Sequence, residues 1–407
     1  MKFLWNKSCF FATVFVFLLI AGISSITLNI QFLEPFGKAL SDFKLTDIVY
    51  SKLRPEQPID TNIVLINTGE FPKKKIAEMI LAIAPHQPKV IGIDHFLLLN
   101  SQDPESDSLV VQALATAGNV TLVSKLTGWN EAGDRWDSLI YSPRVFSQYT
   151  QSGFANVITQ DFRTVRIVTP IEKVGSAREV SFPVRVAQVY DSTATQHFLD
   201  RKNKSEIINY RGNWNYFLAA DTDIGTYSPQ ELEFLRGKIV LFGYLGRYLG
   251  DTLSLEDKFF TPMNPQYAGH TDRDMYGLVI HANVISMILN RSFITELPRW
   301  VSLLLAVFIC YCNMLVFNRI FEKYPTYFEL ISAVILLVEP IALLVAMISL
   351  FLYFSLSIDL TIAVLATFLS ANSLEIYLNL FEPLPRKLRS RYQTWRGKRT
   401  KTRNTTH

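Results

Sequence analysis

The sequence predicts an α/β domain with a mixed, largely parallel sheet, attached to four transmembrane α-helices. Four long apolar runs lie at the two ends of the 407-residue chain, one near the N-terminus and three near the C-terminus. About 270 mostly polar residues separate the first run from the second. Strand and helix patterns alternate in the first half of that polar region, which is typical of a parallel sheet covered by helices.

The four apolar runs have the length of membrane spans. A helix needs roughly 20 apolar residues to cross a bilayer, and the first run, 10–30, exceeds the apolar core of an ordinary signal peptide. The other spans are predicted at 299–318, 327–354 and 360–381. Residues 1–9 then form a short N-terminal segment, 31–298 the domain between spans, and 382–407 a basic tail.

The basic residues predict the orientation of these spans. Lys2 and Lys7 precede the first span, Arg319 and Lys323 lie between the second and third, and 355–359 contains no basic residue. The positive-inside rule therefore puts both termini, the basic tail and the short loop at 318–323 in the cytoplasm. We expect a multi-pass protein of the bacterial inner (cytoplasmic) membrane, with 31–298 in the periplasm or outside the cell.

Composition excludes several functions for the outer domain. Gln31 to Pro298 contains 26 Lys plus Arg against 30 Asp plus Glu, so a nucleic-acid partner is not expected. The basic tail is explained by anionic lipid of the bilayer. All three cysteines, Cys9, Cys310 and Cys312, lie in or beside apolar spans, which leaves the outer domain without disulfides or thiolate zinc sites. Its histidines have no metal-ligand spacing and no nucleophile elbow occurs, so we expect no metal, cofactor, catalytic residue or enzymatic activity.

The periodicity of apolar residues predicts the elements of the outer domain. Strands are expected at 61–67, 89–94 and 119–125, with amphipathic helices at 73–84 and 104–117 between them. In the second half we expect strands at 163–171, 206–210 and 238–243, helices at 182–190 and 229–235, and a helix at 278–289 that leads almost directly into the membrane. The segments 127–151 and 255–273 are predicted to be long loops.

Four residues of the outer domain are candidates for ligand binding. Asp94 ends a predicted parallel strand, where ligands collect in open α/β sheets, although it could equally cap the following loop. Asp251 follows a glycine-rich turn whose spacing matches no phosphate-binding motif. His281 is either a satisfied buried side chain or a ligand contact and pH-sensitive hydrogen bond. Arg211 could bind a carboxylate through its forked donors or form a structural pair within the domain.

Polar residues inside the predicted spans form a second candidate site. Glu339 precedes Pro340 in the third span, while Asn372, Glu375 and Asn379 share one face of the fourth. Ionisable groups in a span are costly and usually face other helices or a water-filled cavity. We expect either hydrogen bonds between helices with a proline kink, or a contact through Glu339 and Glu375 for a partner subunit or a proton-linked step.

A series of short motifs resembles the type-2 CHASE family, the cyclase/histidine-kinase-associated sensory extracellular domains. The motifs are IVLINTGEFP at 63–72, PKVIGIDHF at 88–96, DSLVVQALATAGNVTLVSK at 107–125, SGFANVITQDFRTVRIVTP at 152–170, IINYRGN at 207–213, LRGKIVLFG at 235–243, Asp251, FFTPMN at 259–264 and YGLVIHANVISMIL at 276–289. Their order and the arrangement of one span before and three after the domain strengthen the likeness. Where the family tends to show Asp-x-Asp-Gly-x-x-Arg, residues 161–166 lack the second Asp and the Gly.

The resemblance implies a sensor or interaction domain and does not by itself imply any enzymatic output. We therefore expect an inner-membrane sensor whose outer domain binds a ligand or partner and signals through a separate membrane or cytoplasmic protein, which would contact the loop at 318–323 or the tail. The alternative is a structural or scaffold subunit of a cell-envelope complex. A homodimer is possible, but the sequence contains no heptad repeat that would indicate one.

Overall fold

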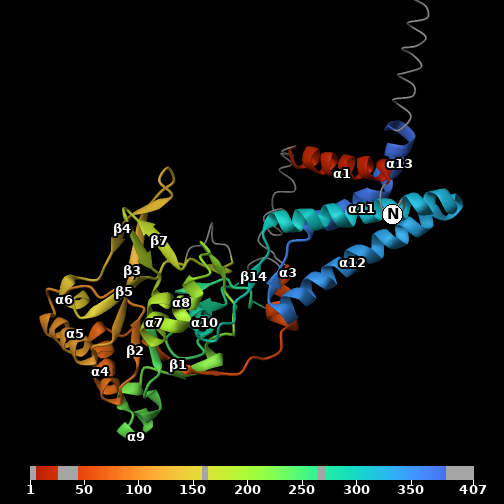
Figure 1. Ribbon diagram of the computed structural model, residues 1–407. Helices are drawn as coiled ribbons and strands as arrows, with labels where there is room; N and C mark the ends of the chain where they lie inside the picture. Colours follow the sequence, from red (N-terminus) through yellow and green to blue (C-terminus); the bar gives the residue numbers. More distant parts are fainter. Residues whose placement is uncertain (1–5, 26–44, 158–163, 265–271, 382–407) are drawn as a thin grey trace, which may run out of the picture. The chain divides into compact units, whose positions relative to one another are not determined.

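The computed structural model describes residues 6–25, 45–157, 164–264 and 272–381 (Figure 1). The chain divides into two compact units, one of Met1–Glu34 with Glu296–His407 and the other of Pro35–Thr295. The basic tail, the end of the first predicted span and residues 161–163 of the family motif lie outside the described residues.

A parallel sheet forms the centre of the unit Pro35–Thr295. Its strands, in spatial order, are β10 (Phe217–Ala220), β1 (Asp60–Asn67), β11 (Ile239–Gly243), β2 (Val90–Ile93), β3 (Val120–Asn130) and β5 (Thr150–Phe154). All five neighbouring pairs in this series are parallel. The predicted largely parallel sheet and its first three strands are therefore confirmed. Sequence periodicity did not predict that β11 lies between β1 and β2, because register across a sheet is a long-range property.

Helices cover both faces of this sheet, as Figure 1 shows. On one face, α4 (Lys73–Ile83) and α5 (Pro104–Ala117) pack on Val64, Ile91 and Phe242. Asp103 caps α5 by accepting a hydrogen bond from the Ser106 N–H, and the left-handed Gly118 ends the helix. The other face carries α7 (Phe182–Tyr190), α8 (Ser192–Leu199) and α10 (Gly277–Leu289). Strands buried on both faces explain the uninterrupted apolar runs in β1 and β11.

Helix α10 is the core helix of this unit. Every residue from Gly277 to Ile288 is buried, and Leu278 packs against Gly243, where an added Cβ would lie 2.8 Å from the Leu278 Cδ1 atom. The sequence predicted this helix and its exit toward the spans. Its position against β1 and β11, beside α7 and α8, shows in addition why apolar residues occur on several sides of the helix.

The predicted loop at 127–151 is wrong. The second half of β3 forms an antiparallel hairpin with β4 (Arg135–Ile140), followed by α6 (Arg144–Ser147) and β5. This hairpin continues the sheet through β7 (Ile171–Val174) and β8 (Ala177–Val180). Trp129 and Trp136 pair across β3 and β4 with ring centroids 5.2 Å apart, so cross-strand contacts offset the turn-rich local sequence.

Short elements complete the unit. The predicted strands at 163–171 and 206–210 shrink to the antiparallel pair β6 (Ile167–Val168) and β9 (Glu206–Ile207). The remaining strands are β12 (Lys258–Phe259) and β13 (Met275–Tyr276), and the remaining helices are α3 (Leu45–Ile48), α9 (Pro229–Leu232), the π-helix η2 (Val49–Leu53) and the 3₁₀ helices η3 (Ala84–His86), η4 (Trp214–Tyr216), η5 (Ile224–Thr226) and η6 (Glu233–Leu235). The strand β12 lies in the predicted loop 255–273, of which 265–271 is not described.

The second unit is a group of apolar helices. They are α1 (Lys7–Ser25), α11 (Arg299–Lys323), η7 (Pro325–Tyr327), α12 (Phe328–Phe354), α13 (Thr361–Ile376) and the π-helix η8 (Tyr377–Phe381), with β14 (Thr295–Glu296) and β15 (Leu356–Ser357) as short extended segments. Among the described residues, four helices are long and apolar enough to cross a membrane: Lys7–Ser25, Arg299–Lys323, Pro325–Phe354 and Thr361–Asn379. The expected loop at 318–323 is instead the last part of α11.

Small residues and one polar cluster hold these helices together. Ala363, Ala366 and Ser370 are buried on α13, which allows close helix approach. Asn313 of α11 donates hydrogen bonds to Glu339 of α12 (2.9 Å) and to Thr367 of α13 (3.4 Å). Glu339 therefore joins three helices.

The packing of α7 on β5 generates a prediction. A Cβ added to Gly153 would lie 2.6 Å from the Phe182 Cα atom, and backbone atoms cannot yield as a side chain can. We expect Gly153→Ala to destabilise the protein by about 1–3 kcal/mol and to lower the midpoint of thermal unfolding by several degrees. The measurement is a thermal scan of the intact protein in detergent.

Gly225→Ala is the matched control, because its Cβ would meet only Met79 Cγ at an ordinary 3.6 Å. An equal midpoint for both variants would contradict the close approach of α7 to the sheet.

Candidate functional site

The carboxyl edge of the parallel sheet brings two of the predicted site residues together. Asp94 follows β2, and His281 lies in the first half of α10. The Asp94 Oδ2 atom is 3.9 Å from the His281 Nε2 atom, and both side chains are largely buried. Asp94 makes no hydrogen bond through its carboxylate within the described ranges. Asp94, which we expected in a ligand-binding crevice, thus lies beside α10.

Burial controls the ionisation of this pair. Loss of solvent raises the pKa of Asp94 to about 7 and lowers the pKa of His281 to about 4. His281, whose ring packs edge-on against Phe182, is therefore neutral at neutral pH. The sequence suggested His281 as the pH-sensitive group. In the structure, the pKa of Asp94 is nearer to neutral pH than the pKa of His281.

A small cavity lies beside His281, and Asp94 does not line it. The cavity that His281 borders, with Phe154 and Ile208 in its wall, has a volume of about 20 Å³. That is room for about one water molecule. Within the described parts of the chain, no group of three His, Cys, Asp or Glu side chains could hold a metal ion.

Asp251 is occupied by its own loop. Its buried carboxylate accepts hydrogen bonds from the Arg247 Nε (3.0 Å) and from the N–H groups of Leu253 (2.9 Å) and Ser254 (3.3 Å). The hydrogen bond from Arg247 is the largest effect that lowers the pKa of Asp251, to about 2. These bonds hold the glycine-rich turn, where Gly246 and Gly250 have positive φ.

Arg211 takes the structural alternative that the sequence left open. Its Nε donates to the Ser286 Oγ (2.9 Å), its Nη1 to the Pro58 carbonyl (2.7 Å), and its Nη2 lies 3.9 Å from the Asp60 Oδ2. Ser286 in turn donates to Asp60 at 2.7 Å. This network joins α10 to the start of β1.

The polar residues of the spans separate into two groups. Glu339 is used inside the helix group, through Asn313 and Thr367. Asn372 and Glu375 lie on the exposed side of α13 and make no hydrogen bond or ion pair with any described residue. The structure therefore does not join Glu375 to Glu339 within one chain.

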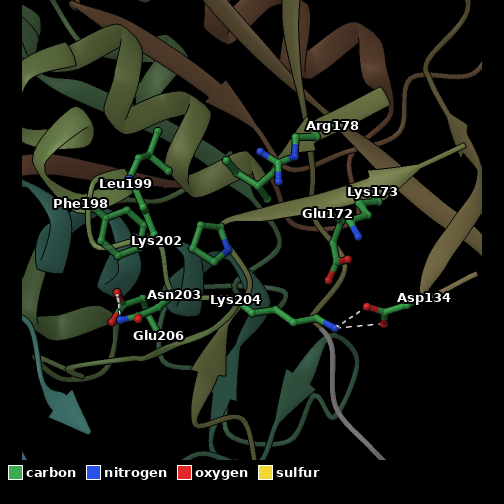
Figure 2. A pocket seen from close by; sticks show the side chains of 12 residues that line it. Asp134, Glu172, Lys173, Arg178, Phe198, Leu199, Lys202, Asn203, Lys204 and Glu206 are labelled. Atoms are coloured by element: carbon green, nitrogen blue, oxygen red, sulfur yellow. Dashed lines mark hydrogen bonds and ion pairs between the residues drawn. The ribbon is translucent and has the colours of Figure 1, made fainter. Parts of the chain in front are cut away.

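A large pocket of the α/β unit Pro35–Thr295 was not predicted from the sequence. It has a volume of about 440 Å³, which is in the range of small-molecule sites. Figure 2 shows its two walls: Glu172, Lys173 and Arg178 come from the β7–β8 hairpin, while Phe198, Leu199, Lys202, Asn203, Lys204 and Glu206 come from the end of α8 and the loop to β9. We call it the hairpin pocket. Its residues are far apart in sequence and belong to no motif, so periodicity carried no signal for it.

The back of the hairpin pocket is tied to the segment that leaves α10. Glu206, 4% exposed in its side chain, accepts two hydrogen bonds from Arg201, at 2.7 and 3.2 Å. Arg201 also donates to the Ile294 carbonyl (3.3 Å) and stacks over the Phe293 ring at 4.9 Å. Phe198, a pocket residue, packs on Phe293 with ring centroids 5.5 Å apart.

A second tie supports the same segment. Asn209, just after β9, donates through its side chain to the Ser292 carbonyl at 2.8 Å. Thr295 and Glu296 alone separate Ile294 from Leu297, whose N–H donates to the Ser357 carbonyl between α12 and α13. The chain therefore passes from the pocket wall to the apolar helices in a few residues.

These features define a class: an α/β domain connected on both sides to apolar helices, with a pocket at the exit of its core helix. The chain belongs to the CHASE2 domain family, whose model matches residues 16–316. CHASE2 domains are sensory extracellular domains, which agrees with a sensor-like role. No curated protein and no solved structure matches the chain.

The pKa of Asp94 generates a prediction. A carboxyl group whose folded-state pKa is raised stabilises the fold below its unfolded-state pKa near 4, and that stability is lost as pH rises toward 7. Asp94→Asn has no carboxyl group to ionise, so the variant does not lose this stability as the pH rises. The midpoint of thermal unfolding of the variant, relative to the unmodified protein, should therefore be several degrees higher at pH 8 than at pH 5, since each pKa unit corresponds to about 1.4 kcal/mol.

Asp251→Asn is the control. The pKa of Asp251 lies far below both pH values, so this variant should lower the midpoint about equally at pH 5 and pH 8. A pH-independent difference for Asp94→Asn would show that Asp94 does not titrate in this range.

Proposed function

We propose that this chain is a sensor of the bacterial inner membrane whose periplasmic domain binds a small ligand in the hairpin pocket. Binding shifts the domain between two arrangements of the segment 290–297, and α11 receives that shift. The CHASE2 family supports the sensory role, and the four apolar helices support the membrane location. The basic residues flanking the spans support cytoplasmic termini and a periplasmic domain.

The contact of Arg201 with Phe293 and Ile294 is the observation that carries this proposal. One guanidinium connects Glu206, in the pocket wall, with the backbone that leaves the core helix. A buried, bidentate pair has a defined geometry and moves as a unit. If a ligand binds one conformation of the α8–β9 loop more tightly than another, it also favours the position of Phe293 and Ile294 that accompanies that conformation.

The partner that reads this signal would contact α13. Asn372 and Glu375 are exposed there, beside apolar Phe368 and Ile376, in a helix apolar enough to span a bilayer. Lipid gives a carboxylate and an amide no hydrogen bonds, so a polar side chain from another transmembrane helix stabilises them. We propose a separate membrane protein at this face.

The sensor proposal is tested on the intact protein in lipid nanodiscs. A library of periplasmic metabolites is screened for compounds that raise the midpoint of thermal unfolding, because a ligand of the folded state stabilises it by mass action. Hydrogen exchange of the amides in 290–297 is then compared with and without each such compound. A compound that stabilises the protein and changes this exchange supports the sensor. Purification of a stoichiometric partner with no stabilising compound would instead support a scaffold subunit.

The Arg201 link gives a prediction that needs no ligand. Arg201→Met combined with Glu206→Gln removes both charges of the pair, so that no buried charge is left alone. We expect amide exchange at Phe293 and Ile294 to become at least tenfold faster, while exchange in β1 and β11 stays the same. The measurement is hydrogen exchange followed by mass spectrometry.

Arg236→Met with Glu233→Gln is the matched control, because that ion pair is more than half exposed on both sides and lies on another surface of the unit. Unchanged exchange at Phe293 in the Arg201 variant would refute the mechanical link.

The α13 face gives a further prediction. Asn372→Leu with Glu375→Leu should leave the yield and thermal midpoint of the protein unchanged, since neither side chain has a partner among the described residues. The amount of copurified membrane partner should fall at least fivefold. Phe368→Leu, an exposed apolar position on the same helix, is the control and should retain the partner. Full recovery of the partner with the double variant would exclude this face.

A further inference from the structure

The β7–β8 hairpin places two cations side by side at the hairpin pocket. Lys173 and Arg178 are register partners on the two strands, both line the pocket, and both are exposed. Like charges directly opposite each other destabilise an antiparallel pair. Neither side chain forms an ion pair with any residue in the described ranges, so this repulsion has no compensation within the protein.

The opposite wall of the pocket carries a third cation in a strained position. Lys202, after the end of α8, has φ of +55°, a conformation that is costly for residues other than glycine. It is exposed and has no acidic partner in the parts of the chain that the structure describes. Lys204 lies nearby and pairs with Asp134 at 3.0 Å, but both are largely exposed and such a pair contributes little stability.

The acidic groups of the pocket do not neutralise these cations. Glu206 is held by Arg201, and Asp134 by Lys204. The remaining acid is the buried Glu172, so the pocket is lined by four cations, Lys173, Arg178, Lys202 and Lys204, and by three acids, Asp134, Glu172 and Glu206. Lys173, Arg178 and Lys202 therefore give the pocket a positive potential.

Apolar side chains line the same cavity as the cations. They are Ile171 on the hairpin side and Phe198 and Leu199 at the end of α8, and the cavity has a volume of about 440 Å³. Sites of this kind bind the carbon skeleton of a small ligand on apolar side chains and orient it through a few charged groups. Cations on two walls of a partly apolar cavity fit a short carbon chain with an acid group at each end.

We propose that the hairpin pocket binds a small organic dianion of the dicarboxylate type, with one acid group between Lys173 and Arg178 and the other at Lys202. The forked donors of Arg178 suit a carboxylate, and the second acid group offsets the charge of the opposite wall. This inference rests on the proposed function, because it names the ligand class of the same pocket. A dianion that bridges the walls draws the hairpin toward the α8–β9 loop, and Arg201 in that loop, paired with Glu206 of β9, transmits the movement to Phe293 and Ile294.

The test uses the intact protein in nanodiscs and a series of linear dicarboxylates from succinate to pimelate. Calorimetric titration should show binding with an optimum at one chain length. The monoanion butyrate, the neutral succinamide and inorganic phosphate should each bind at least tenfold more weakly than the optimal dicarboxylate. Phosphate in this series distinguishes an organic dianion from a general anion site.

Two variants decide which wall is used. Lys173→Ala with Arg178→Ala, and separately Lys202→Gly, should each weaken dicarboxylate binding at least tenfold. Lys202→Gly also relieves the backbone strain, so the protein should be at least as stable as before while binding is lost. Lys125→Gln, an exposed lysine on β3 away from the pocket, is the matched control and should bind normally.

The outcomes separate this proposal from the sensor itself. Absence of binding by every dicarboxylate, equal binding of phosphate, or unchanged binding by the pocket variants overturns the dianion site, while the Arg201 link keeps its own test. Binding that depends on the three cations but leaves exchange in 290–297 unchanged supports the dianion site and refutes its coupling to α11.

Discussion

The structure depends on one constraint: the helix that completes the core of the α/β unit is also the segment from which the chain continues to the apolar helices. Helix α10 is buried along its whole length and mostly apolar, so its packing on the sheet beside α7 is a large part of what stabilises that unit. Its C-terminal end cannot move freely, because its body is close-packed against Gly243 and Phe182. The short segment after Leu289 is the connection from this helix to α11.

That segment is held by polar contacts rather than by apolar packing alone. Arg201, Glu206 and Asn209 bond to one another or to the backbone at Ser292 and Ile294. Directional contacts of this kind can exchange between a few discrete partners. A close-packed core, in contrast, resists small displacements. The pocket next to Arg201 is therefore better placed to control the exit segment than the Asp94–His281 pair, which lies in the rigid part of the unit beside a cavity of about 20 Å³.

Sequence reasoning succeeded where short-range patterns control the outcome. The strands at 61–67, 89–94 and 119–125 and the helices between them follow from local apolar periodicity, and the structure contains them as β1, β2, β3, α4 and α5. It failed at 127–151, where Gly, Asp and Tyr indicate loops but the Trp129–Trp136 contact and pairing with β7 stabilise a hairpin. Among the candidate site residues, Asp94 and His281 came together, whereas Asp251 and Arg211 bond to their own surroundings.

The family, the apolar helices and the parallel α/β core could be predicted from local patterns, because apolar content and periodicity act over a few neighbouring residues. The three-dimensional fold was needed to find that β11 lies between β1 and β2, that Glu339 bonds to Asn313 while Glu375 is exposed, and that a pocket forms between the β7–β8 hairpin and the α8–β9 loop. Each of these results depends on contacts between residues distant in the chain. Their free energies come from packing and burial in three dimensions, which no local pattern records.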